Sequence, residues 1–87
     1  MQHQQAPDWI QSHALSETMC LVGRKLKELG DHDNFVAGSI GVRDFIRKTK
    51  LEAISAMVKA DQEGGEEEAV MHAGNDVIDE AINGFFQ

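Results

Sequence analysis

Residues 42–61 read VRDFIRKTKLEAISAMVKAD, and this stretch decides the fold. At about 100° per residue, its apolar side chains fill one face of a helix and continue onto a flank. The face suits a core inside the protomer and consists of Val42, Phe45, Ile46, Thr49, Ala53, Met57 and Ala60. The flank carries Leu51, Ile54 and Val58. Since a helix with apolar side chains on two sides needs two neighbours, the stretch predicts a helical bundle.

Two more helices are predicted, one on each side of this central stretch. Residues 9–29 carry apolar side chains at heptad spacing, and this seam is expected to pack inside the bundle. The seam consists of Leu15, Met19, Val22, Leu26 and Leu29. Gly64 and Gly65 then interrupt the helical pattern, and a last helix with a broad apolar arc is expected over residues 66–83.

The ends of the first helix carry sequence signals of their own. Asp8 follows Pro7 and is placed to cap the helix, with Gln11 at the position of a capping-box partner. Gly30 follows the last apolar residue of the seam, so we expect it to end the helix in a left-handed conformation.

These patterns together predict one all-α domain in a chain of 87 residues. Residues 1–7 are expected to form a disordered tail and residues 8–87 a single helical domain. The connector, residues 30–41, contains glycines that should break the helix and has room for a short helical turn. The predicted fold is a small bundle of three to four helices, dimeric, whose last two helices form a hairpin. The expected helices are residues 9–29, 42–62 and 66–83.

The sequence lacks several features of membrane and secreted proteins, which bears on its cellular location. No apolar run approaches the roughly 18 residues that a transmembrane helix needs. The first residues lack the basic and apolar regions of a secretory signal. Cys20 is the single cysteine and cannot form a disulfide within the chain, which favours a reducing compartment. We therefore expect a cytoplasmic protein that is not bound to a membrane.

Charge is distributed very unevenly along the chain. Residues 1–62 hold eight acidic and eight basic side chains, whereas residues 63–87 hold seven acidic and no basic ones, so the net charge of −7 lies in the last helix and its entry. An acidic helix can attract a basic partner, although carboxylates in a first helical turn also simply favour the helix start. The candidate partner-binding residues are Glu66, Glu67, Glu68, Asp76, Asp79 and Glu80.

No convergent set of reactive groups is visible in the sequence. Cys20 has no histidine three or four residues away, and Ser39 does not sit in a nucleophile elbow. His72 lies near acidic residues of the last helix, but on its polar face, whereas carboxylate-bridged metal sites direct their ligands into the core. The sequence thus predicts no catalytic residue, no cofactor and no metal.

A basic stripe opens the central helix and consists of Arg43, Arg47 and Lys50. Three cations in a row could contact the phosphates of a nucleic acid, which makes a small nucleic-acid-binding dimer one alternative. The chain is acidic overall and has no aromatic side chains along the stripe, so a nucleic-acid partner is not favoured. If the last two helices form a hairpin, equal distances from its turn would instead place Arg47 near Glu80 and Lys50 near Asp76 or Val77. The stripe would then be neutralised within the chain or by a second copy.

The apolar surface exceeds what one small bundle is expected to bury, so a homodimer is predicted. The candidate self-association residues are Leu51, Ile54, Val58, Phe85 and Phe86. Size and acidity favour a non-enzymatic interaction module, such as a small inhibitor, an antitoxin-like protein or a regulatory adaptor of the kind that phages encode. Such a module would engage a basic surface of a larger protein. A structural subunit of a larger assembly is the main alternative.

Overall fold

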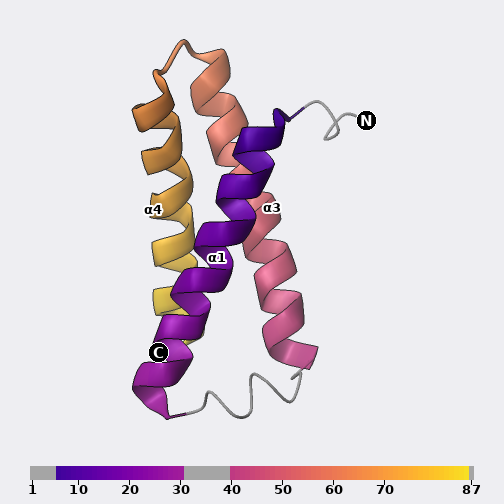
Figure 1. Cartoon of the computed structure of the whole chain (residues 1–87), viewed down its shortest axis with the longest axis vertical. Helices are drawn as coiled ribbons and strands as arrows, with labels where there is room; N and C mark the ends of the chain where they lie inside the picture. Colours follow the sequence, from indigo (N-terminus) through magenta and orange to yellow (C-terminus); the bar gives the residue numbers. More distant parts are fainter. Residues whose placement is uncertain (1–5, 31–39, 87) are drawn as a thin grey trace.

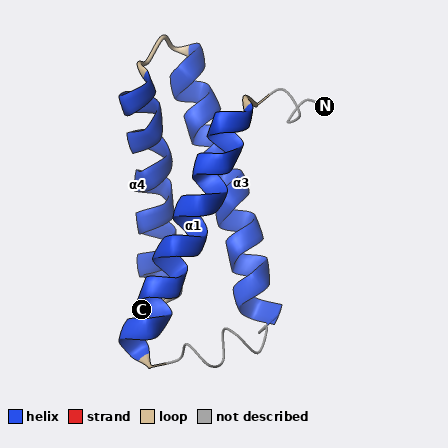
Figure 2. Cartoon of the chain, viewed as in Figure 1, coloured by secondary structure: helices blue, strands red, loops and turns tan. Residues whose placement is uncertain are grey.

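Three helices make up the described part of the chain (Figures 1 and 2). The structure is a computed structural model that describes residues 6–30 and 40–86. Helix α1 spans Asp8–Leu29, α3 spans Ile40–Gln62 and α4 spans Glu67–Phe85. These residues contain no strand, so the prediction of an all-α fold is confirmed. The expected turn in the connector and most of the expected tail lie outside the described residues.

Helices α3 and α4 form an antiparallel hairpin, and α1 crosses this hairpin obliquely (Figure 1). In the hairpin turn Gly64 has a φ of 88°, a left-handed value that glycine adopts without strain. The backbone N–H of Gly65 donates to the carbonyl of Ala60 at 3.0 Å and closes the end of α3. α1 packs against both helices of the hairpin, so the three helices share one core.

The core is built from rows of side chains that repeat every four residues. In α1 the buried row is Ile10, Ala14, Thr18, Val22 and Leu26. In α4 it is Val70, Gly74, Ile78 and Ile82. Four residues correspond to about 400°, so such a row drifts by about 40° at each step and winds around the helix. Helices that interlock through these rows cross at an oblique angle of about 50°, in keeping with the path of α1.

The heptad seam predicted for α1 is therefore wrong in part. Val22 and Leu26 are buried, but Leu15, Met19 and Leu29 are 45%, 43% and 50% exposed. A heptad seam suits helices that run nearly parallel, whereas an oblique helix buries its four-residue row. The row includes Thr18, a polar residue whose hydroxyl donates to the Ala14 carbonyl at 2.7 Å and so tolerates burial.

The core face predicted for the central helix is confirmed in α3. Ile46, Thr49, Ala53 and Met57 are buried. Val42, Phe45 and Ala60 are partly buried and pack against the same core. α3 begins at Ile40, so Gly41 lies inside its first turn and the helix break expected at this glycine does not occur.

The predicted helix ends have mixed outcomes. Gly30 has a φ of 79°, and its N–H lies near the carbonyls of Leu26 and Lys27, so the left-handed C-cap is confirmed. The predicted Asp8 cap is wrong, because Pro7 occupies the N-cap and no side chain caps the helix. The Pro7 carbonyl instead accepts hydrogen bonds from two backbone N–H groups of the first turn. Asp8 becomes the first helical residue, where its charge still complements the helix dipole.

A cluster of three aromatic rings holds the open end of the hairpin. Phe45 of α3 stacks on Phe85 with ring centroids 4.2 Å apart. Phe86 meets both rings edge-on, at 4.9 Å from Phe85 and 6.1 Å from Phe45. Both arrangements are favourable for aromatic pairs. The cluster also shows which side of α3 faces α4, namely the side that carries Phe45.

Candidate interaction surface

The acidic residues predicted to bind a partner all lie on the surface of α4 and its entry. Glu66, Glu67, Glu68, Asp76, Asp79 and Glu80 are all exposed. Glu68, His72, Asp76 and Glu80 follow one another at four-residue steps, about 6 Å apart along the helix. This acidic line lies opposite the buried row of α4, because each of its members precedes a buried residue by two positions, about 200° around the helix.

The carboxylates of the acidic line have no cationic partner within the described residues. The one ion pair recorded there joins Lys25 to Glu28 at 4.0 Å within α1. The predicted pairing of Arg47 with Glu80 is therefore wrong, as is the pairing of Lys50 with Asp76. Residues at equal distance from the hairpin turn are level along its axis, but neither Arg47 nor Lys50 forms an ion pair across it within the described residues. Arg47 lies about 200° around α3 from Phe45, which faces α4.

Helix electrostatics explain only half of the acidic residues. Glu67 and Glu68 lie in the first turn of α4 and complement the positive end of its dipole. Asp76, Asp79 and Glu80 lie in the second half, toward the negative end, where the last turn holds no basic residue. Asp76 and Glu80 are also like charges four residues apart, which costs about 0.2–0.5 kcal/mol. The helix dipole therefore does not account for these three carboxylates, and none of them has an ion-pair partner among the described residues.

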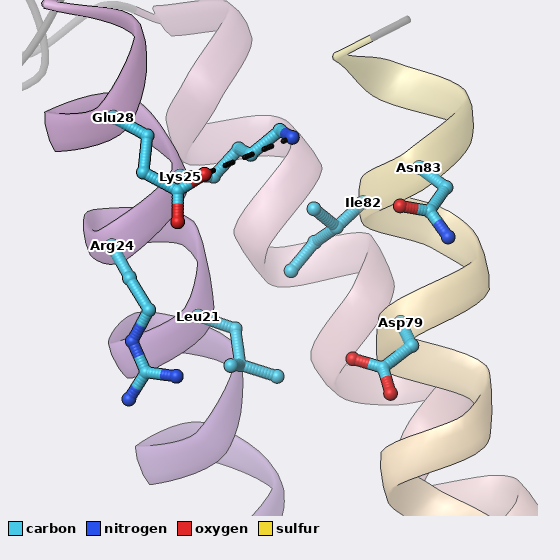
Figure 3. Close-up of a pocket in the computed structure, with 7 residues that line it drawn as sticks. All are labelled: Leu21, Arg24, Lys25, Glu28, Asp79, Ile82 and Asn83. Atoms are coloured by element: carbon cyan, nitrogen blue, oxygen red, sulfur yellow. Dashed lines mark ion pairs between the residues drawn. The ribbon is translucent and has the colours of Figure 1, made fainter.

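Asp79 connects the acidic line to a groove between α1 and α4 (Figure 3). The groove has a volume of about 260 Å³ and is open to solvent. Leu21 and Ile82 point into it from the two helices, and Asp79 enters from the α4 side. The complete lining is Leu21, Arg24, Lys25, Glu28, Asp79, Ile82 and Asn83. An apolar floor beside carboxylates can take the stem and the charged end of a lysine or arginine side chain.

The sequence did not predict this groove, because its two walls come from helices far apart along the chain. Periodicity identifies which residues share a face of one helix, but not which faces of two helices meet. A partial signal was present in Leu21, which lies outside both the heptad seam and the buried row of α1. Its half-buried side chain packs against the core.

A side-chain hydrogen bond positions α1 on α4 near this surface. His13 Nε2 lies 3.0 Å from Asn75 Oδ1, and because a carbonyl oxygen only accepts, the histidine nitrogen must donate. Replacing His13 with alanine should lower the free energy of unfolding by about 0.5–1.5 kcal/mol in urea denaturation. Asn75→Ala should cost a similar amount, and the double variant less than the sum. Ser12→Ala, at an exposed neighbour, is the control and should stay within about 0.5 kcal/mol. Strict additivity of the two single changes would contradict the pairing.

The two arginines of the basic stripe lie about 200° around α3 from Phe45, which faces α4. Arg43 and Arg47 are exposed and Lys50 is half-buried. Phe45, the aromatic residue nearest to the two arginines in sequence, is on the other side of the helix and stacks on Phe85. The stripe therefore offers cations to a partner without a ring on which a nucleic-acid base could stack.

The residues predicted to mediate self-association fall into two groups. Ile54, Val58 and Phe86 are half-buried and pack against the core. Leu51 and Phe85 are 52% and 46% exposed, although Phe85 also stacks on Phe45. Their role in self-association stays a prediction. The structure adds two exposed apolar residues on α1, Leu15 and Met19, which the heptad interpretation had assigned to the core.

The remaining candidate chemistry is sparse in the described ranges. Cys20 is exposed, and Arg24 Nη2 lies 3.9 Å from its Sγ. Within the described residues, no group of three or more His, Cys, Asp or Glu side chains could hold a metal ion. Ser39 lies outside this part of the chain. None of the helices described above combines the length and hydropathy needed to cross a membrane.

In comparisons with known proteins, the chain matches no family model, no curated protein and no solved structure.

Proposed function

We propose that this chain is a non-enzymatic interaction module whose acidic α4 surface engages a basic surface of a larger protein. The proposal rests on three exposed carboxylates that have no cationic partner among the described residues, those of Asp76, Asp79 and Glu80. A small inhibitor, an antitoxin-like protein or a regulatory adaptor in the cytoplasm would use such a surface to occupy a site on its target.

The physical advantage of this arrangement lies in long-range attraction. A net charge of −7, concentrated in residues 63–87, speeds the encounter with a positively charged target and repels acidic competitors. Along the acidic line, the carboxylates of Glu68, Asp76 and Glu80 are about 12 and 6 Å apart, and they form a row of anions like the phosphates that nucleic-acid-binding proteins recognise. A basic partner would relieve the repulsion between Asp76 and Glu80 on binding.

The groove between α1 and α4 supplies a specific contact beside this general attraction. A lysine or arginine from the partner can lay its aliphatic stem over Leu21 and Ile82 and place its charge near Asp79. Arg24 and Lys25 line the other side of the groove and would exclude a second cation. The groove therefore favours one basic side chain in one orientation.

Three variants with the same change in charge test the proposal. After affinity capture from the native host and identification by mass spectrometry, the purified partner is titrated at 0.15 M salt, a roughly physiological level. Asp76→Asn, Asp79→Asn and Glu80→Gln together should weaken binding roughly 3- to 150-fold, since each exposed pair contributes about 0.2–1 kcal/mol. Glu66→Gln, Glu67→Gln and Glu68→Gln together should also weaken binding, since these residues belong to the proposed surface. The matched control carries Asp44→Asn, Glu52→Gln and Asp61→Asn, at exposed positions of α3, and should bind almost as well as the parent. Equal weakening by all three variants would show that only net charge acts, and unchanged binding by the first two would refute the proposal.

Exposed apolar side chains favour a second candidate function, a structural subunit of a larger assembly. Leu15, Met19, Leu29 and Leu51 are each about half exposed, and they lie on two different helices. An assembly subunit would give an open series of particle sizes in light scattering, whereas an interaction module should give one small species. The unpaired basic stripe would support nucleic-acid binding only if the protein retained generic DNA at physiological salt.

A further inference from the structure

The outer side of α1 is an exposed surface with almost no charge. In Figure 1, α1 lies in front of the hairpin, and none of the other described helices covers its outer side. Between residues 9 and 23 the one charged side chain is Glu17. Ser12, Leu15, Ser16, Met19 and Cys20 are all exposed there. In a chain with 26% charged residues, this neutral stretch is unusual and marks a surface suited to another helix.

This surface carries a projection and a recess on the same side of one helix. Leu15, Met19 and Gly23 are four residues apart and thus neighbours on the helix. Leu15 and Met19 project, with 45% and 43% of their surfaces exposed. At Gly23 an added Cβ would meet no atom within 4 Å, so the position is open. Leu15, Met19 and Gly23 each follow a buried residue of α1 by one position, about 100° around the helix, so they lie on a flank of α1 beside its buried row.

Self-complementarity of this kind is what a two-fold interface requires, because the same patch must supply both members of each contact. Leu15 and Gly23 lie at equal distances on either side of Met19. If two α1 helices run antiparallel across a two-fold axis at Met19, each Leu15 meets the Gly23 of the other copy. In this register, two residues are level with each other when their numbers add up to 38.

Charge supports the antiparallel direction. The first turn of α1 is acidic at Asp8 and its last turn is basic at Lys27. In this register Lys27 faces Gln11 of the other copy, and Asp8 lies three residues from that position, about 4.5 Å along the axis. The arrangement also keeps the two acidic α4 surfaces apart, which matters because two copies with a net charge of −7 each repel one another.

We propose that two copies of this chain associate through the flanks of α1 that carry Leu15, Met19 and Gly23, antiparallel, with Leu15 of each copy seated against Gly23 of the other. This surface differs from the acidic α4 surface and does not depend on the proposed function. The α4 surfaces stay free, so the dimer presents two of them. A partner with two basic sites would gain affinity from bivalent binding.

The first experiment measures mass in solution and compares two pairs of variants. Sedimentation equilibrium should give twice the chain mass of 9.6 kDa. Gly23→Leu fills the recess and Leu15→Glu places a charge at the contact, and each should raise the dimer Kd at least tenfold. The matched controls are Gly84→Leu, at another helical glycine with no atom within 4 Å of an added Cβ, and Leu51→Glu, at an equally exposed leucine on α3. Both controls should remain dimeric, and circular dichroism verifies the fold of all four variants.

The second experiment uses the natural cysteine to determine direction. In this register Cys20 is level with position 18 of the other copy along the helix axis. The two Cys20 residues are therefore offset by two residues, about 3 Å, along this axis. A short bis-maleimide should therefore link the parent protein into a covalent dimer. In a Cys20→Ser, Ser12→Cys variant the two cysteines would be 14 residues apart, about 21 Å, and should not be linked.

Three outcomes would overturn the proposal. One is a monomer at the highest soluble concentration. Another is dissociation by Leu51→Glu but not by Leu15→Glu, which would place the contact on the flank of α3. The third is equal cross-linking at positions 12 and 20, which indicates parallel helices.

Discussion

Replacing Met57 with alanine is expected to lower the free energy of unfolding by about 2–5 kcal/mol. The Met57 side chain is fully buried in the shared core and lies directly against Gly74 of α4. Removing it leaves a cavity that the rigid hairpin fills only in part. A small domain is stable by only about 5–15 kcal/mol, so the loss should be evident in urea denaturation followed by circular dichroism.

The same contact predicts an unusual effect at Gly74. Alanine is normally favoured over glycine inside a helix by about 1 kcal/mol. At Gly74, however, an added Cβ would lie 2.5 Å from Met57 Sδ and 2.7 Å from Met57 Cγ, so the substitution overpacks the core. Overpacking typically costs about 1–3 kcal/mol and the gain in helix propensity offsets about 1 kcal/mol of it, so we expect Gly74→Ala to destabilise by up to about 2 kcal/mol. Gly84→Ala, where the added Cβ meets nothing within 4 Å, is the control and should not destabilise.

A double variant separates this contact from general damage to the core. If the Met57 side chain is what Gly74 accommodates, Met57→Ala and Gly74→Ala together should cost clearly less than the sum of the single changes. Additive losses, within about 0.5 kcal/mol, would show that the two residues do not compete for the same space.

The second large effect is expected at Phe45, the central ring of the aromatic cluster. Phe45→Ala removes a ring that stacks on Phe85 and meets Phe86 edge-on. Burial of Phe45 is only partial, so we expect a loss of about 2–3 kcal/mol, below the 3–5 kcal/mol typical of fully buried phenylalanines. Thermal unfolding should show a lower Tm, and hydrogen exchange should show faster opening at the open end of the hairpin.

Phe45→Leu is the matched control for ring geometry. Leucine keeps most of the apolar contact but removes the aromatic pairing, which contributes about 0.5–1.5 kcal/mol beyond buried area. The control should therefore lose roughly that amount. If the leucine variant were as unstable as the alanine variant, a specific shape requirement rather than buried area would dominate at this position.

Local signals in the sequence were sufficient to predict the helices and the core face of α3. Ile46, Ala53 and Met57 follow helical periodicity, and Gly30 stops α1 because glycine adopts the left-handed conformation readily. These features depend on residues a few positions apart, so they could be predicted without knowing how the helices pack.

The orientation of α1 could not be predicted in the same way. The helix contains two apolar rows, a heptad seam that includes Leu15 and Met19, and a four-residue row that includes Ala14 and Thr18. Both are plausible, and the crossing angle with the hairpin decides which is buried. Thr18 also counts as polar in a binary pattern, although its hydroxyl is satisfied within its own helix. The seam therefore looked stronger than the row that forms the core.

The candidate surface was likewise predictable only in part, because some of its features depend on how the helices pack. The six carboxylates were evident from composition and spacing, and the structure places all of them at the surface. The missing partners of Asp76 and Glu80 could not be inferred, because they depend on the rotation of α3 relative to α4. Arg47 is level with Glu80 along the hairpin, but it lies about 200° around α3 from Phe45, which faces α4. The groove around Asp79 likewise requires two helices to meet.

The acidic line and the buried row lie on opposite sides of α4, so the proposed binding surface and the core consist of different residues. Glu68, Asp76 and Glu80 each stand two positions before a core residue, and none of them contributes to the core. If the proposed interaction holds, substitutions along the acidic line would change the preferred partner without disturbing helix packing. Such a chain could then follow changes in its partner over evolutionary time at little cost in stability.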